Sequence, residues 1–148
     1  MTVPFSRTVC ACATCQSCCK SQPGHVLPGE VERIAEYLGK PLPEVLSLFW
    51  ASPGALVMDT STGRQFRIGT ITPRFDRRAK RCVFLGADDR CTVHEVAPFG
   101  CAYFDTHMSA AEGQRRSAWG LRLLHDDPTY IAQRKSLPFA DSYKPKGY

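Results

Sequence analysis

The sequence predicts a small α+β domain that is stabilised by a metal, and three observations lead to this prediction. The chain has 148 residues, the usual size of one domain with a single modest core. Apolar residues at helical spacing predict three to four helices, and a central stretch with strand-like alternation predicts a short β-hairpin. Seven of the eight cysteines form two clusters, and all of these except Cys82 lie outside the expected elements. The expected metal ligands therefore lie mainly on loops.

The first helix is expected over residues 28–39. Pro28 suits a first helical turn, Glu30 and Glu32 favour the positive end of the helix dipole, and Gly39 suits the position after the last turn. The apolar residues that recur at helical spacing predict its buried face, which consists of Val31, Ile34, Ala35 and Leu38.

The middle of the chain changes from helical to strand-like patterns. A second helix is expected from Pro43 to about Ala51, where residues 52–54 end it. Two strands follow over residues 55–59 and 64–72, and residues 82–85 form a further short strand. In the second strand, one face is expected to carry Phe66, Ile68 and Thr70, and the other Gln65 and Arg67.

Two helices are expected near the C-terminus. Ser109 and Glu112 have the spacing of a capping box, which begins a helix that runs to about residue 125. Asp127 as the cap and Pro128 at the first position begin a last helix that runs to about residue 134.

Composition indicates an ordinary globular protein, with 43% hydrophobic and 22% charged residues. Its longest apolar stretches, such as residues 46–51, are far shorter than the ~20 residues of a membrane span. The N-terminus has no secretory h-region or cleavage site. We therefore expect a cytoplasmic protein with no membrane partner, in which reducing conditions favour metal ligation over disulfides.

The first cysteine cluster reads Cys12-x-x-Cys15-x-x-Cys18-Cys19 and places four thiols within eight residues. Two intervening residues let the chain turn and aim two sulfurs at one ion, which suits tetrahedral zinc as well as an iron–sulfur cluster. The second cluster follows more than sixty residues later. Seven cysteines are thus the candidate metal ligands: Cys12, Cys15, Cys18, Cys19, Cys82, Cys91 and Cys101.

Cys18 and Cys19 are adjacent and point in different directions in most backbone conformations, so serving one mononuclear ion would strain the chain. They suit a multinuclear centre, two sites, or a site in which one of them is not a ligand. Seven thiolates are also one short of two four-thiolate sites.

The eighth donor has several candidates. Cys10 lies outside the motif and is interpreted as a bystander. Among the histidines, His94 is the best placed, because it follows Cys91 by three residues. His25 and His107 are less well placed.

These motifs together resemble the CxxCxxCC family of zinc- or iron-chelating domains, the YkgJ-like group. The resemblance rests on the first cluster, on Cys82-Val-Phe-Leu, on Cys91-Thr-Val-His-Glu-Val-Ala-Pro98 and on Cys101-Ala-Tyr-Phe. It implies metal chelation by the seven cysteines. In two departures, His94 replaces the family's Tyr and Ala97 replaces its Arg before proline. The expected organisation is one metal-binding domain over residues 1–148, with a family-like core over 12–104, C-terminal helices over 109–136 and a loose tail over 138–148.

The charge of the chain says less about its partners than the cysteine motifs do. The formal net charge is +5, and residues 74–81 carry five basic side chains. We interpret this stretch as a solvated loop, or as an offset to the negative charge of a thiolate centre, because no nucleic-acid-binding motif surrounds it. Nucleic acid is therefore not an expected partner.

The sequence leaves three functions open. The first is metal chelation, storage, delivery or sensing without catalysis, and the second is a redox enzyme or electron carrier. The third is a structural zinc domain that binds a protein or nucleic-acid partner. The adjacent cysteines and the odd ligand count favour iron, in an iron–sulfur cluster, with zinc as the alternative. The sequence assigns no catalytic residue.

Overall fold

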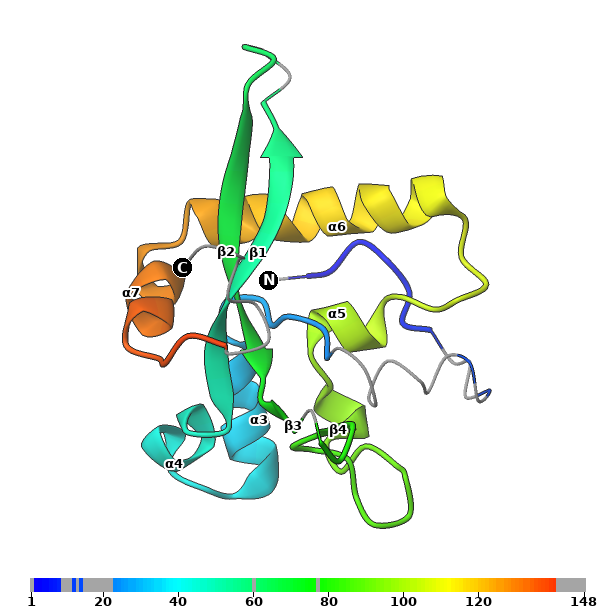
Figure 1. Cartoon of the computed structure of the whole chain (residues 1–148), viewed down its shortest axis with the longest axis vertical. Helices are drawn as coiled ribbons and strands as arrows, with labels where there is room; N and C mark the ends of the chain where they lie inside the picture. Colours follow the sequence, from blue (N-terminus) through cyan, green and yellow to red (C-terminus); the bar gives the residue numbers. More distant parts are fainter. Residues whose placement is uncertain are drawn as a thin grey trace.

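The computed structural model describes residues 2–8, 12, 14, 23–59, 61–76 and 78–140. In this part of the chain, helices pack around one antiparallel hairpin, and a second, two-residue ladder lies beside it (Figure 1). The predicted small α+β domain is confirmed. In chain order the elements are α3 (Glu30–Leu38), α4 (Leu42–Leu46), β1 (Phe49–Met58), β2 (Gln65–Pro73), β3 (Phe75–Asp76), β4 (Arg81–Cys82), the 3-10 helix η1 (His94–Val96), α5 (Phe99–Ala102), α6 (Ala110–His125) and α7 (Pro128–Lys135).

The β1–β2 hairpin is the centre of the fold and extends beyond the helices at one end (Figure 1). Its register shifts between Ser52 and Ala55. Gly54 lies in this bulge with a φ of 73°, and a Cβ there would lie 1.7 Å from the Ile68 carbonyl oxygen. Only glycine fits such a position.

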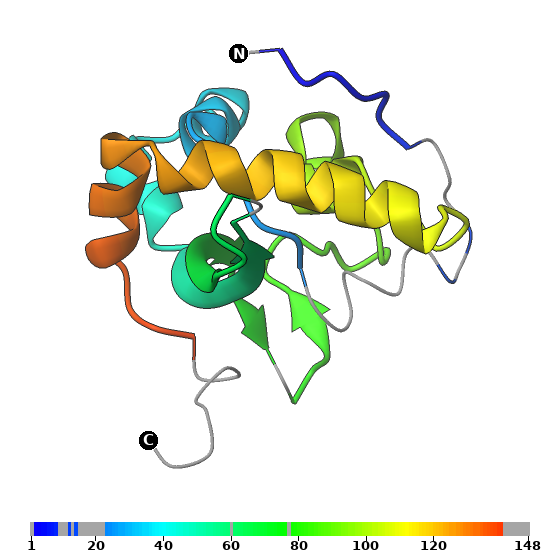
Figure 2. The same cartoon turned by 90° about the horizontal axis from the view of Figure 1, so that it is seen from above.

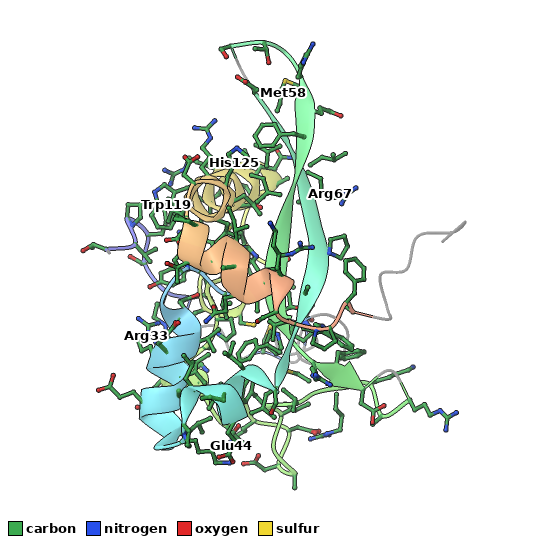
Figure 3. All side chains as sticks on the ribbon, turned by 90° about the vertical axis from the view of Figure 1, so that its left-hand side faces the viewer. Arg33, Glu44, Met58, Arg67, Trp119 and His125 are labelled. Atoms are coloured by element: carbon green, nitrogen blue, oxygen red, sulfur yellow. The ribbon has the colours of Figure 1, made fainter. Side chains whose placement is uncertain are left out.

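The two faces of the hairpin differ as the alternation in β2 predicts. Ile68 is buried, and the Phe66 ring packs against the His125 ring of α6 with 4.9 Å between centroids. Arg67 points away from the helices, and Met58 lies at the far end of the hairpin (Figure 3). Over residues 65–68 the hairpin therefore has one face toward the core and one in solvent, whereas residues 70–73 are all buried, so both faces are covered there.

The predicted second helix is wrong beyond Leu46, where α4 ends. Residues 49–51 belong to β1 instead, and Trp50 pairs with Thr72 of β2. The indole Nε1 of Trp50 also donates to Thr72 Oγ1 at 3.1 Å. Pairing with a strand more than twenty residues away overrides the local helical pattern.

Side-chain and glycine caps fix the helix ends where the sequence predicts them. Gly39 takes the left-handed conformation, with a φ of 65°, and its N–H bonds to the last turn of α3. Ser109 Oγ accepts from the Glu112 N–H at 3.2 Å, and Asp127 Oδ1 accepts from the Tyr130 N–H at 2.8 Å. These contacts confirm the start of α6 and of α7.

The core lies between the hairpin, α3, α5 and α6, and α6 crosses the molecule over it (Figure 2). Tyr130 links three parts of this core, because its hydroxyl donates to the Val26 carbonyl and accepts from the Ile71 N–H. The chain beyond α7 pairs with β1, since Ala51 bonds to both Pro138 and Ala140. No helix of the described residues is long and apolar enough to cross a membrane. The largest fully buried side chains include Phe49, Phe99, Leu27, Ile34, Ile71 and Leu124.

Candidate metal centre

The segment before the first cysteine cluster is held against α5 and α6 (Figures 1 and 2). The Phe5 ring packs edge-on against Trp119 of α6, with 5.4 Å between centroids. Arg116 donates to the Ser6 carbonyl at 3.0 Å, and the Thr8 N–H donates to the Ala102 carbonyl at 2.8 Å. The chain therefore enters the cluster from a fixed position beside Cys101.

Asp105 connects this segment to the loop after α5. One carboxylate oxygen accepts from the Thr8 hydroxyl at 2.6 Å, and the other accepts from the His107 N–H at 2.9 Å. These hydrogen bonds lower the pKa of Asp105, so the carboxylate stays ionised. Cys12, four residues after Thr8, has its Sγ 3.5 Å from His107 Nε2.

The chain leaves the first cluster beside the second one. The Gly24 N–H donates to Cys101 Sγ at 3.2 Å, and the Gly100 N–H donates to the His25 carbonyl at 2.9 Å. Gly24 and Gly100 meet backbone to backbone, and a Cβ on Gly24 would lie 2.1 Å from the Gly100 carbonyl carbon. Both described flanks of the first cluster thus contact residues 100–107.

Cys82 and Cys91 lie on either side of the turn that follows β4. Cys82 is buried in β4 opposite Phe75, and Cys91 forms an isolated bridge with Leu85. Burial raises the pKa of the Cys91 thiol, and a hydrogen bond from the Val93 backbone lowers it by less. Because a ligand thiol must lose its proton, metal binding at Cys91 would release a proton from a thiol that burial keeps protonated.

The described residues account for only part of the predicted ligand set. Cys15, Cys18 and Cys19 lie outside the described residues, as does Cys10. Within the described residues, no three His, Cys, Asp or Glu side chains lie close enough to hold a metal ion. The structure brings Cys12 to His107 and Cys101 to Gly24, while Cys82 ends β4 and Cys91 lies opposite Leu85 in the loop that follows.

His94 contacts no sulfur of the described cysteines, although the sequence makes it the best-placed histidine. It is exposed at the start of η1, and its carbonyl accepts from the Arg7 guanidinium. His107 lies beside a cysteine instead. The only sequence signal for His107 is its position six residues after Cys101, and that spacing matches no common ligand motif.

Glu30 holds the start of α5 in place, a role that the sequence did not predict. Its Oε1 accepts from the Leu27 N–H at 2.6 Å and from the Phe99 N–H at 2.9 Å. Burial raises the pKa of Glu30, against the lowering effect of these bonds and of Arg33. The carboxylate therefore ties the start of α3 to a residue two positions before Cys101.

The basic stretch has local structural contacts. Arg81 forms a 2.7 Å ion pair with Asp89 and donates to the Gly86 carbonyl. Arg74 Nε donates to the Phe49 carbonyl at 3.2 Å. Arg74 and Arg81 thus bond to neighbouring parts of the protein, and the interpretation of the stretch as a solvated loop or a charge offset stays a prediction.

His25 is a buried histidine, and its burial lowers the pKa of the imidazole. Desolvation lowers its pKa to about 4, and its buried Nε2 has no hydrogen-bond partner among the described residues. Its ring meets the Phe99 ring edge-on, with 5.7 Å between centroids. A pocket of about 270 Å³ lies between this segment, the hairpin and α6, lined by residues that include Gly24, Ser52, Thr72, Gly100 and Leu121.

We expect His25 to make the protein sensitive to mild acid. Below pH 6.5 the unfolded chain binds a proton at this residue, whereas the folded chain does so only near pH 4. Stability should therefore fall between pH 6.5 and 4, by about 3 kcal/mol at most. Urea unfolding of the wild type and of His25→Gln measures the difference. His125→Gln, at an exposed histidine, is the control. Parallel pH profiles for the wild type and His25→Gln would contradict this expectation.

Thiols and imidazoles are the side chains that bind zinc and iron in proteins, and the described residues bring one such pair together, Cys12 and His107. The fold and the cysteine pattern therefore suit the class of cysteine-rich metal-binding domains. The sequence profile of the CxxCxxCC family, described as a putative zinc- or iron-chelating domain, matches residues 11–120. The chain belongs to this family, which confirms the resemblance seen in the sequence. The searches of curated proteins and of solved structures gave no match.

Proposed function

We propose that the chain is a cytoplasmic metal-binding protein that holds zinc or iron through thiolates from both cysteine clusters. The hydrogen bond from the Gly24 N–H to Cys101 Sγ carries this proposal, because it joins the segment that follows the first cluster to a cysteine of the second cluster, across 77 residues. A reducing compartment keeps such thiols available as ligands. The proposed ligands are Cys12, Cys15, Cys18, Cys19, Cys82, Cys91 and Cys101.

A backbone N–H group of the chain stabilises the sulfur of Cys101 in the form that binds a metal. The Gly24 N–H donates to Cys101 Sγ, and a bond from a backbone N–H favours the thiolate over the thiol. The bound metal supplies the positive charge that stabilises the remaining thiolates. Because ligands come from both clusters, binding should stabilise the contact between the N-terminal segment and α5.

Within this proposal, an iron–sulfur cluster is favoured over a mononuclear zinc ion. Adjacent Cys18 and Cys19 suit the several metal atoms of a cluster better than one tetrahedral ion. An iron–sulfur centre would support electron transfer or redox chemistry. Zinc would give a structural domain whose surface binds another protein.

Purification without oxygen, followed by elemental analysis and a visible spectrum, tests the proposal. Iron with acid-labile sulfide and a broad absorption band toward the blue would support an iron–sulfur centre. Zinc in a colourless protein would support the structural alternative. Protein that binds neither metal after anaerobic loading would refute the proposed function.

Replacing Cys15 or Cys91 separately by serine is expected to lower both metal content and melting temperature. Each change removes one ligand of a centre that joins distant segments, so either loss should weaken the whole assembly. Cys10→Ser is the control, because Cys10 lies outside the motif and should tolerate the change. Full metal content in both ligand variants would mean that the shared centre does not exist.

A further inference from the structure

His107 lies beside a proposed ligand of the metal centre. Its Nε2 is 3.5 Å from Cys12 Sγ, and both residues are exposed. We propose that His107 is itself a metal ligand, bound through Nε2 next to the thiolate of Cys12. This inference rests on the proposed function and adds an eighth donor to the seven cysteines.

The distance between the two atoms suits joint ligation. In a tetrahedral zinc site the metal lies about 2.3 Å from sulfur and about 2.0 Å from nitrogen, so two such ligands are ~3.5 Å apart. Cys12 Sγ and His107 Nε2 already have this separation. A metal can therefore bind both atoms without bringing them closer together or moving them apart.

The position of His107 is set by contacts on both sides of the pair. Asp105 accepts from the backbone of His107 and from the hydroxyl of Thr8. Thr8 is also bonded to Ala102, and it precedes Cys12 by four residues. One carboxylate therefore orients the loop that carries the imidazole and the segment that carries the thiol, as outer-shell groups do at metal sites.

The other histidines have different surroundings. All four histidines lie in the described part of the chain, and among them His107 is the one whose ring nitrogen contacts the sulfur of a described cysteine. His25 has its Nε2 buried with no hydrogen-bond partner in the part of the chain that the structure describes, and His125 packs against Phe66. His94 is exposed and contributes its carbonyl to Arg7.

The donor count supports the same assignment. Seven thiolates are one short of two four-coordinate sites, and one imidazole supplies the missing donor. A histidine also changes the charge of its site, because it replaces a thiolate by a neutral ligand. A site of three thiolates and one histidine is thus one unit less negative than a site of four thiolates.

X-ray absorption at the edge of the bound metal tests this proposal on the wild-type protein. For zinc, the expected result is a mixed shell of sulfur and one nitrogen per His-containing site, with imidazole scattering. For an iron–sulfur cluster, pulsed EPR of the reduced protein labelled with ¹⁵N-histidine should show coupling to one histidine nitrogen. Metal bound by sulfur alone would overturn the assignment of His107 and leave the proposed function standing. Absence of any bound metal would refute both.

Variants assign the nitrogen signal to a residue. His107→Ala should abolish it and weaken metal binding by at least about tenfold, measured by competition with a chromophoric chelator. His107→Cys should restore the affinity with an all-sulfur shell. His94→Ala is the matched control, because His94 is also exposed and close to a cysteine in sequence. A nitrogen signal that survives His107→Ala, or disappears in His94→Ala, would contradict the proposal.

Discussion

Replacing Gly100 by alanine is expected to lower the free energy of unfolding by about 3 kcal/mol and to reduce metal content. A Cβ on Gly100 would lie 2.6 Å from the Gly24 Cα and from the His25 nitrogen. Both are backbone atoms, so the clash can be relieved only by separating the two segments. Overpacking of this kind costs about 1–3 kcal/mol, and the rigid partner places Gly100→Ala at the upper end.

The loss of metal follows from the same separation. Moving Gly24 away from α5 stretches its hydrogen bond to Cys101 Sγ, which links the segment after the first cysteine cluster to the second cluster. Gly24→Ala should have a similar effect, because its Cβ would lie 2.1 Å from the Gly100 carbonyl carbon. Chemical denaturation and elemental analysis of the same preparations measure both quantities.

Gly113→Ala is the matched control for these two changes. Gly113 lies in α6, and a Cβ there would have no neighbour within 4 Å. Alanine should therefore stabilise the helix by up to about 1 kcal/mol and leave metal content unchanged. If Gly100→Ala behaved like Gly113→Ala, the backbone contact between Gly24 and Gly100 would have no role in assembling the centre.

Local signals in the sequence were sufficient to predict most of the regular elements. Ser109 and Asp127 cap their helices with their own side chains, and Gly39 ends α3 through its own backbone conformation. Each signal acts within one helical turn, so it can be recognised without knowing the rest of the fold. The alternation in β2 was equally informative over residues 65–68, where the more exposed and the more buried side chains alternate, but residues 70–73 are all buried.

The errors occur where distant contacts decide the structure. Residues 49–51 look helical in isolation, yet Trp50 pairs with Thr72 and Ala51 with Ile71. The short helix α5 was also not predicted. It has no side-chain cap, and the N–H of its first residue, Phe99, is bonded by Glu30 from another helix. Tertiary contacts of this kind leave no periodic signal in the sequence.

In the candidate site, too, local sequence signals could be recognised and distant contacts could not. Cysteine type and spacing predicted a metal centre, and the family match agrees with that expectation. The groups that bring the clusters together could not be predicted, because each is a single residue with a distant partner. Asp105 binds Thr8 across 97 residues, and Gly24 meets Cys101 across 77. Glycines and carboxylates are common, so neither stands out without the fold.

Glu30→Ala is expected to destabilise the protein by about 2–5 kcal/mol. The change removes the acceptor of the Leu27 and Phe99 N–H groups, both of which are bonded in the buried interior. Each unsatisfied buried N–H costs about 1–3 kcal/mol. The desolvation that raises the pKa of Glu30 is relieved at the same time, and this gain offsets part of the loss.

The effect of Glu30→Ala should reach the metal centre through α5. Phe99 begins this helix two residues before Cys101, so release of its N–H loosens the backbone that positions the thiol. Glu30→Gln keeps a carbonyl oxygen as acceptor, and it should therefore retain more stability and more metal than Glu30→Ala. Glu36→Ala, at an exposed position of the same helix, controls for the loss of one charge. If denaturant unfolding gave the same midpoint for Glu30→Ala and Glu36→Ala, the buried carboxylate would not be the link between α3 and the segment that carries Cys101.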